Sequence, residues 1–195
     1  MGTFDLDQFW VDETTEHMEV ARKTFMGLTE AFGQWLDVCE SCIRSGGKII
    51  FFGNGGSASD AQHLATELTA RYITDRKAIA ALALTTDTSA LTAIGNDMGF
   101  EKIFSRQIEA LGREGDIAIG ISTSGNSANV LEALKVARAA GLVTVGLTGN
   151  KGGKMPDLCD ILLCVPSKTT ARIQEMHITL GQMLCGALEQ RLGLV

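Results

Sequence analysis

The sequence contains few of the features that mark a disordered, secreted or membrane-spanning chain. Its 195 residues include only two prolines beside 22 glycines, which excludes a collagen-like or proline-rich disordered chain and favours an α/β protein with many strand-to-helix turns. No apolar run approaches the roughly 20 residues that cross a bilayer. The first twenty residues are acidic and lack the basic and apolar segments of a secretory signal, so we expect a cytoplasmic protein that does not bind membranes.

The numbers of basic residues and cysteines also argue against a nucleic-acid-binding protein and against a disulfide-stabilised one. The chain has 17 lysines and arginines against 23 acidic residues, a net charge of −6, so we expect no nucleic-acid partner held by bulk electrostatics. Its five cysteines are an odd number and do not indicate a disulfide framework. Cys39 and Cys42 form a C-x-x-C, but three residues separate neighbours on one helix face, and we interpret both as buried apolar residues rather than a redox pair.

What the sequence does contain is an alternation of apolar runs and helical patterns. Residues 5–45 have apolar positions at spacings of three and four and predict a helical arm that ends at Gly46 and Gly47. Helical patterns also cover about 59–72, 128–140 and 170–191. Further helical stretches lie between the apolar run AIAALAL and residue 111. The apolar runs between them are KIIFFG, AIAALAL, DIAIGIS, LVTVGLT and DILLCVP.

Five nearly continuous apolar runs separated by helices indicate strands that are buried on both faces. We therefore predict a doubly wound α/β fold with a five-stranded parallel sheet flanked by helices. At 195 residues, 45% of them hydrophobic, the chain forms one domain, 1–195, in which 1–45 is the arm. In such sheets the ligand lies beyond the carboxyl ends of the strands, so the loops after the first and third runs are the places to expect a site.

The loop after the third run carries four hydroxyls within six residues, directly before a helix. They belong to Ser122, Thr123, Ser124 and Ser127. A helix N-terminus offers unpaired N–H donors and partial positive charge, and hydroxyls around it add donors, so the pattern predicts a site for a phosphate or another anion. The alternative is ordinary N-capping, which needs only one such side chain.

The loop after the first run is rich in glycine and also leads into a helix. It contains Asn54, Gly55, Gly56 and Ser57. It lacks the G-x-G-x-x-G pattern of dinucleotide-binding loops. Glycines let the backbone approach a small ligand, and the Asn54 and Ser57 side chains can bond its hydroxyls. The alternative is a tight turn without a ligand.

Two of the predicted helices carry polar side chains at spacings that place them on one helix face. His63 and Glu67 are spaced i to i+4, so they share one helix face and suit joint coordination of a metal ion, although such pairs are also common on solvated faces. Gln174 and Gln182, eight residues apart, look toward one side of the last helix. His177 lies about 140° from Gln182 around that helix, and we expect it to be a packed core histidine.

Taken together, GNGGSASDAQH, LTTDTSALTAIGND, GISTSGNSANV and ARIQEMH resemble the sugar-isomerase (SIS) domain family, and most closely its members that act on seven-carbon sugar phosphates. The likeness runs from about Gly46 to the last residue. It implies a homotetramer that interconverts sedoheptulose 7-phosphate and D-glycero-D-manno-heptose 7-phosphate for the heptose of lipopolysaccharide or capsule.

The resemblance also implies roles for individual residues. The phosphate-binding hydroxyls fall on Ser122, Thr123, Ser124 and Ser127. The sugar-contacting residues fall on Asn54, Gly55, Gly56, Ser57, Asn96, Asp97 and Gln174. The zinc ligands fall on His63, Glu67, Gln174 and residue 182, and the catalytic groups on Glu67, as the base, and residue 182.

At residue 182 this chain has Gln where the family has His. A carboxamide binds zinc weakly through oxygen and cannot act as a general base, so we expect lower zinc affinity, lower turnover or both. Two alternatives remain open. One is a non-enzymatic SIS protein that binds a sugar phosphate or associates with a replication initiator. The other is an isomerase of a hexose or pentose phosphate. The presence of both Glu67 and Gln174 favours an enzyme.

Overall fold

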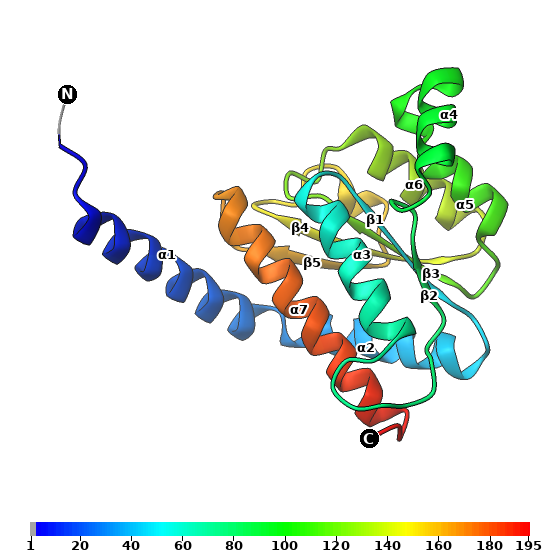
Figure 1. The fold of residues 1–195 in the computed structure, drawn as a ribbon, viewed down its shortest axis with the longest axis horizontal. Coiled ribbons are helices and arrows are strands. Elements are labelled where there is room, and N and C mark those ends of the chain that lie inside the picture. The colour runs from blue at the N-terminus through cyan, green and yellow to red at the C-terminus, as the bar shows by residue number, and fades with distance from the viewer. Residues whose placement is uncertain (1–2) are drawn as a thin grey trace.

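The computed structural model describes residues 3–195, which form seven α-helices and five strands; the first helix projects from the body (Figure 1). The helices are α1 (Leu6–Gly27), α2 (Thr29–Arg44), α3 (Gly56–Thr69), α4 (Thr88–Met98), α5 (Ser105–Leu111), α6 (Ala128–Ala139) and α7 (Thr170–Arg191). The strands are β1 (Ile49–Gly53), β2 (Ala81–Ala83), β3 (Ile117–Ile121), β4 (Val143–Gly149) and β5 (Ile161–Val165). Short 3₁₀ turns cover Phe100–Lys102 and Met155–Asp157.

All five strands pair in parallel, in the order β2-β1-β3-β4-β5. The register is set at β1, where Ile49 pairs with Ala81 of β2 on one side and with Ile117 of β3 on the other. Every residue of β1 and β3 is buried, which explains why these runs show no alternation of polar and apolar residues. The predicted doubly wound sheet is confirmed. Because successive strands are added on opposite sides of β1, the topological switch point lies between β1 and β3.

Helices cover both faces of the sheet and bury a separate apolar core on each. Ile49 and Phe51 point toward α2, α3 and α7, while Ile50 and Phe52 point toward α5 and α6. All four strand side chains are fully buried. Each fully buried side chain of this size contributes roughly 1.5–3 kcal/mol to folding, so the two cores fix the sheet as a rigid platform for the loops at its edge.

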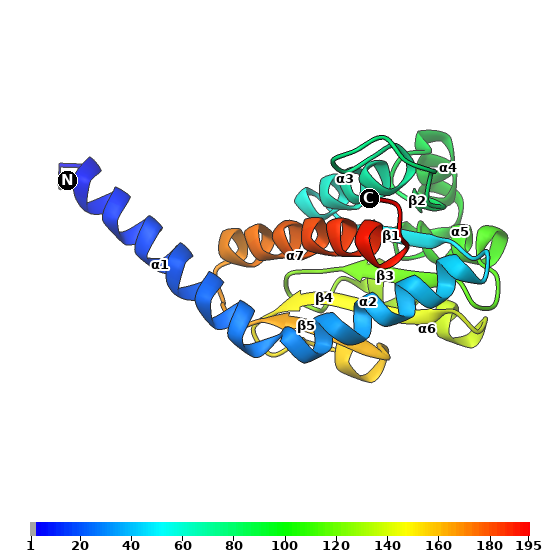
Figure 2. The same cartoon turned by 90° about the horizontal axis from the view of Figure 1, so that it is seen from below.

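The N-terminal arm is helical, as its apolar spacing predicts, and the structure divides it in two. It consists of two helices that meet at Leu28, whose φ and ψ of −111° and 8° fall outside the helical range. Gly27 precedes the break, where a residue without a Cβ weakens the helix. α2 packs into the core under the sheet, whereas α1 extends away from the body (Figure 2). Within α1 only Val20 and Thr24 are buried.

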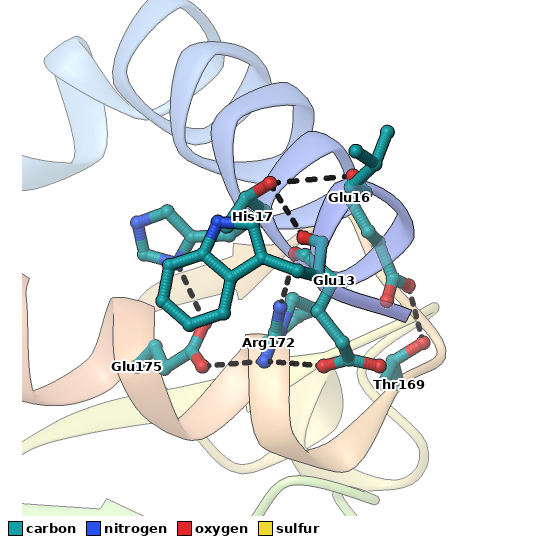
Figure 3. Close-up of polar contacts among 9 residues, drawn as sticks. Glu13, Glu16, His17, Thr169, Arg172 and Glu175 are labelled. Carbon is teal, nitrogen blue, oxygen red and sulfur yellow. Dashed lines mark hydrogen bonds and ion pairs between the residues drawn. The ribbon is translucent and has the colours of Figure 1, made fainter. Parts of the chain in front are cut away.

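Polar contacts attach α1 to the start of α7 (Figure 3). Arg172 is nearly buried and donates from Nη1 to the Glu13 carbonyl and from Nη2 to Glu175 Oε1, both at 2.7 Å. His17 Nδ1 lies 2.8 Å from Glu175 Oε2, and Thr169 donates to Glu16. His17 keeps 47% of its side chain exposed. These contacts fix the direction in which the arm leaves the body.

All five cysteines are free, and Cys39 and Cys42 are buried against the core. Burial raises the pKa of the Cys42 thiol to about 11, so it stays protonated and unreactive near neutral pH. Their interpretation as buried apolar residues agrees with this environment.

Among residues 3–195, no helix combines the length and the hydropathy needed to span a bilayer.

Candidate functional site

The two loops that the sequence singles out are joined to each other by a pair of asparagines. Asn54 follows β1, and Asn129 lies in the first turn of α6, after β3. Each donates from Nδ2 to the other's Oδ1 at 2.8 Å, and Asn129 Oδ1 also accepts from the Val130 N–H. The Asn54 amide therefore fixes the loops relative to each other, a role that sequence reasoning missed for Asn129.

The hydroxyls of the loop after β3 surround the N-terminus of α6. Ser122 is buried, and its Oγ lies 2.9 Å from Ser127 Oγ. Ser124 Oγ accepts the Asn126 N–H, while Thr123 is only partly covered. Ser127 occupies the N-cap position but makes no side-chain cap bond. Ser127 therefore does not cap α6, and because Asn129 Oδ1 already takes the Val130 N–H, the N–H groups of Ala128 and Asn129 are the donors left for an anion.

A third loop, which sequence reasoning did not identify, borders this one. Gly125 has a φ of 65°, and a Cβ there would lie 2.0 Å from the carbonyl oxygen of Gly152, in the loop after β4. The Lys154 N–H donates to the Gly125 carbonyl at 2.9 Å. Only glycine permits this conformation and this approach, so Gly125 is required by the packing of two loops.

The glycine-rich loop brings α3 close to the end of the sheet. Gly55 has a φ of 58°, and the Ser57 N–H closes the turn on the Asn54 carbonyl at 3.0 Å. Ser57 is buried, while Gly55 and Gly56 are exposed. A Cβ on Gly56 would lie 2.6 Å from Gln174 Nε2. The loop thus gives the Gln174 side chain a place against the first turn of α3.

One turn and two turns further along α3, His63 and Glu67 face the second glutamine of α7. His63 Nε2 lies 3.1 Å from Glu67 Oε1 and 3.1 Å from Gln182 Nε2. The helices approach closely here because residue 181 is glycine, whose ideal Cβ would lie 2.4 Å from Leu64 Cδ1. We call the row formed by Gln174, Gln182, His63 and Glu67 the α3–α7 seam. The structure places His63, Glu67 and Gln182 in contact there, while Gln174 lies against Gly56 at the start of α3.

His177 lies on another side of α7, as its helical angle predicts. Its Nε2 donates to the Thr148 carbonyl of β4 at 3.0 Å, and Nδ1 is buried without a partner. Burial lowers the pKa of His177 to about 4, so the ring is neutral near pH 7. It is a core residue and does not reach the seam.

The seam offers a limited set of metal ligands. It has one imidazole, one carboxylate and two carboxamides, and residues 3–195 contain no cluster of three or more His, Cys, Asp or Glu that could hold an ion. Since the N and O of an amide are assigned from contacts, Gln182 can equally turn its oxygen toward His63. The donors fit zinc with His63 and Glu67 as strong ligands and amide oxygens as weak ones.

Asp60, which sequence reasoning passed over, lies one turn before His63 on α3. Its Oδ2 is buried and has no hydrogen-bond partner. Burial raises the pKa of this carboxyl to about 6, while the neighbouring His63 opposes the rise. No periodicity distinguishes such a residue from a solvated aspartate, so only the packing of α3 identifies it.

Asn96 and Asp97 are not at the seam. Both are exposed on α4, and Asn96 Nδ2 donates to Asp97 Oδ1 at 2.7 Å. No hydrogen bond within residues 3–195 connects them to the loops after β1 and β3. Their contact with a sugar remains a prediction.

Known proteins share this arrangement over nearly the whole chain. Residues 10–149 match the SIS domain family. Phosphoheptose isomerase from Paramagnetospirillum magneticum is 59% identical over 181 residues, which cover 93% of this chain and 94% of that protein. The solved phosphoheptose isomerase from Neisseria gonorrhoeae is 46% identical with a TM-score of 0.90 and covers 95% of this chain and 100% of its own.

A second solved structure, a phosphoheptose isomerase from Francisella tularensis, is 36% identical with a TM-score of 0.92, covering 96% of this chain and 100% of its own. These likenesses confirm the resemblance seen in the sequence motifs. The chain therefore belongs to the phosphoheptose isomerase family of SIS-domain proteins.

Proposed function

We propose that this protein is a phosphosugar isomerase that converts sedoheptulose 7-phosphate to D-glycero-D-manno-heptose 7-phosphate in the cytoplasm, for the heptose of lipopolysaccharide or capsule. The observation that carries the proposal is the seam, where Glu67 and the Gln182 amide both contact His63, together with the serine-rich loop at the N-terminus of α6. Relatives named phosphoheptose isomerase, at 50–59% identity over 91–93% of this chain, support the substrate.

The phosphate binds to the loop after β3 in this proposal. Ser122, Thr123, Ser124 and Ser127 supply hydroxyls, and the first turn of α6 supplies N–H groups and the positive end of its dipole. Asn54, Gly55, Gly56 and Ser57 border the sugar chain. Binding energy from the phosphate, far from the reacting carbons, holds those carbons at the seam.

Glu67 is the base. Conversion of the ketose requires removal of a proton from C1 while the C2 carbonyl oxygen gains one, which gives an enediol; the O1 proton then leaves as C2 is protonated. A single carboxylate that reaches both carbons can carry the first and last transfers. Glu67 keeps 19% of its side chain exposed, so it is accessible to a ligand. Gln182 carries no titratable proton but can donate to or accept from a sugar oxygen.

His63 and Glu67 would hold zinc, and the amide oxygens of Gln174 and Gln182 would be its weaker ligands. The chemistry that bound zinc would supply is polarisation of a sugar carbonyl. Two of the four ligands are neutral amides, and we expect weaker binding than at a site with two histidines.

The working form is a homotetramer in which the arm packs against other copies. α1 and the residue Phe4 before it expose apolar side chains: Phe4, Leu6, Phe9, Trp10, Val11, Met18, Phe25 and Met26 are each more than 40% exposed. A cavity of about 490 Å³ between α1 and α7 is lined partly by Phe9, Trp10 and Met18. A surface of this kind indicates a protein interface.

The test is turnover of sedoheptulose 7-phosphate by the purified protein, with and without added zinc. We expect the aldose 7-phosphate to form, Glu67→Gln to lose at least about 100-fold in kcat, and Ser124→Ala to raise KM by an amount equivalent to about 1–3 kcal/mol. Ser45→Ala, at the exposed end of α2, is the control. Tight sugar-phosphate binding without turnover would instead support a sensor, and faster turnover of a pentose or hexose phosphate would reassign the substrate.

A further inference from the structure

Outside the seam, one ion pair is buried almost completely. Arg76, in the segment between α3 and β2, donates from Nε to Glu189 Oε1 of α7 at 2.7 Å. The two side chains are only 1% and 2% exposed, which makes this the most buried ion pair within residues 3–195. Removing two charges from water has a large desolvation cost, which the attraction between them offsets only when further hydrogen bonds are made. The other hydrogen bonds of Arg76 and Glu189 are therefore informative about the role of the pair.

The shortest of the other Arg76 hydrogen bonds go to the last turn of α3. Nη2 donates to the carbonyl of Glu67 and Nη1 to the carbonyl of Leu68, each at 2.7 Å, while Nη1 also donates to the Ala70 and Lys77 carbonyls at 3.3 and 3.2 Å. The Glu67 and Leu68 carbonyls have no partner inside a helix that ends at Thr69, although Leu68 also accepts the Ile79 N–H at 3.0 Å. Arg76 therefore caps the turn that carries the catalytic base, and one of its hydrogen bonds is to the backbone of that base.

Glu189 fastens the same segment to α7. Its Oε1 also accepts the Tyr72 N–H at 3.1 Å. Gly186, one turn earlier, lets the Tyr72 ring pack close, since an ideal Cβ there would lie 3.0 Å from Tyr72 Cε1. The end of α3 is thus tied to the end of α7 through one buried carboxylate.

The seam depends on how these two helices lie against each other. The contact of His63 with Gln182 joins α3 to α7, and Gln182 stands seven residues, about two turns, before Glu189. We propose that Arg76 and Glu189 are positioning residues for the isomerase reaction, holding Glu67 and His63 of α3 in register with Gln182 of α7. This inference rests on the proposed function.

A purely stabilising pair and a positioning pair predict different results when both charges are replaced. An apolar pair of similar volume often stabilises a fold as well as a buried ion pair does, whereas loss of one partner leaves a buried charge. Methionine restores packing but offers no donor to the Glu67 carbonyl. The double variant Arg76→Met/Glu189→Met therefore separates the two roles.

We expect the double variant to fold, to keep KM for sedoheptulose 7-phosphate within about threefold because the loop after β3 is unchanged, and to lose at least about tenfold in kcat because small displacements of reacting groups are costly. Arg76→Lys retains the charge but not the planar fork that reaches three oxygens, so it folds and loses kcat as well. Ile108→Ala, on α5 in the opposite core, controls for lost stability alone.

The second readout is the affinity for Zn²⁺, measured by competition with a chromophoric chelator. We expect weaker binding in the double variant and wild-type affinity in Ile108→Ala. Wild-type kcat together with wild-type zinc affinity in the double variant would overturn the inference. If the wild type itself fails to isomerise the heptulose phosphate, the proposed function fails, and an unchanged zinc affinity in the double variant then overturns the positioning role independently.

Discussion

Gln182 places a carboxamide 3.1 Å from the imidazole of His63, at the position where the resemblance to the SIS family implies a second imidazole. As a zinc ligand, the amide would offer only a weak oxygen donor and no titratable proton. In the proposed function, Glu67 performs the proton transfers without a second ionisable group at position 182. The expected effect on zinc affinity can be measured by substituting Gln182 alone.

Gln182→His is therefore predicted to raise the affinity for zinc by at least about tenfold and to raise kcat, because an imidazole replaces a neutral oxygen donor. Chelator competition and the turnover assay measure the two effects. Gln190→His, on an exposed position of the same helix, is the matched control. Unchanged zinc affinity in Gln182→His would show that residue 182 is not a ligand.

His177 gives a second prediction at the scale of one residue. Its pKa of about 4 in the folded protein lies below its ordinary value of 6.5, so the unfolded chain binds the proton more tightly and stability falls as the pH drops from about 6.5 to 4. His177→Gln, which keeps an N–H for the Thr148 carbonyl, removes this dependence.

Between pH 7 and pH 5, the free energy of unfolding of the wild type should fall by about 2 kcal/mol more than that of His177→Gln, from 1.36 kcal/mol per pKa unit. Urea unfolding at the two pH values measures the difference. Parallel losses in the two proteins would contradict a neutral buried ring.

At the scale of elements, the contact of α3 with α7 decides whether the seam exists. The Leu64 side chain packs directly against Gly181, in space that the Cβ of any other residue would occupy. Gly181→Ala is predicted to destabilise the fold by about 1–3 kcal/mol through overpacking and to lower kcat by separating His63 from Gln182.

Gly33→Ala is the matched control because its Cβ would enter open space in the middle of α2. It should leave kcat unchanged and stabilise the protein by about 0.5–1 kcal/mol through helix propensity. Thermal unfolding and turnover of both variants check the pair. If Gly181→Ala matched Gly33→Ala in stability and rate, close approach of the helices would be irrelevant to the site.

Elements with strong local signals could be predicted from the sequence. α7 begins at Thr170 and ends at Arg191, as its apolar spacing predicts, and Gly193 follows it with a φ of 68°. The arm was less predictable, since both of its halves have helical spacing and a single residue, Leu28, breaks them. Asn54 and Asn129 are separated by 75 positions in the sequence, and Arg76 and Glu189 by 113. No local periodicity encodes contacts over such separations.

At the scale of the whole molecule, α1 carries exposed apolar side chains that a single copy of the chain leaves uncovered. Trp10 is 67% exposed on it. Trp10→Glu is predicted to shift the protein from tetramers toward smaller assemblies, because a charge replaces a large apolar contact. Light scattering after gel filtration measures the mass, and Thr15→Glu, at an exposed polar position of the same helix, is the control. A tetramer that survives the Trp10 change would place the interface elsewhere.

In the proposed reaction, a carboxylate on α3 moves a proton between two carbons of a phosphorylated heptulose. The most direct measurement is isomerisation in D₂O, with the position of deuterium in the product read by NMR. We predict D-glycero-D-manno-heptose 7-phosphate carrying deuterium at C2, and almost no product from Glu67→Gln. Formation of the aldose by Glu67→Gln at the wild-type rate, or no aldose from the wild type, would contradict the account.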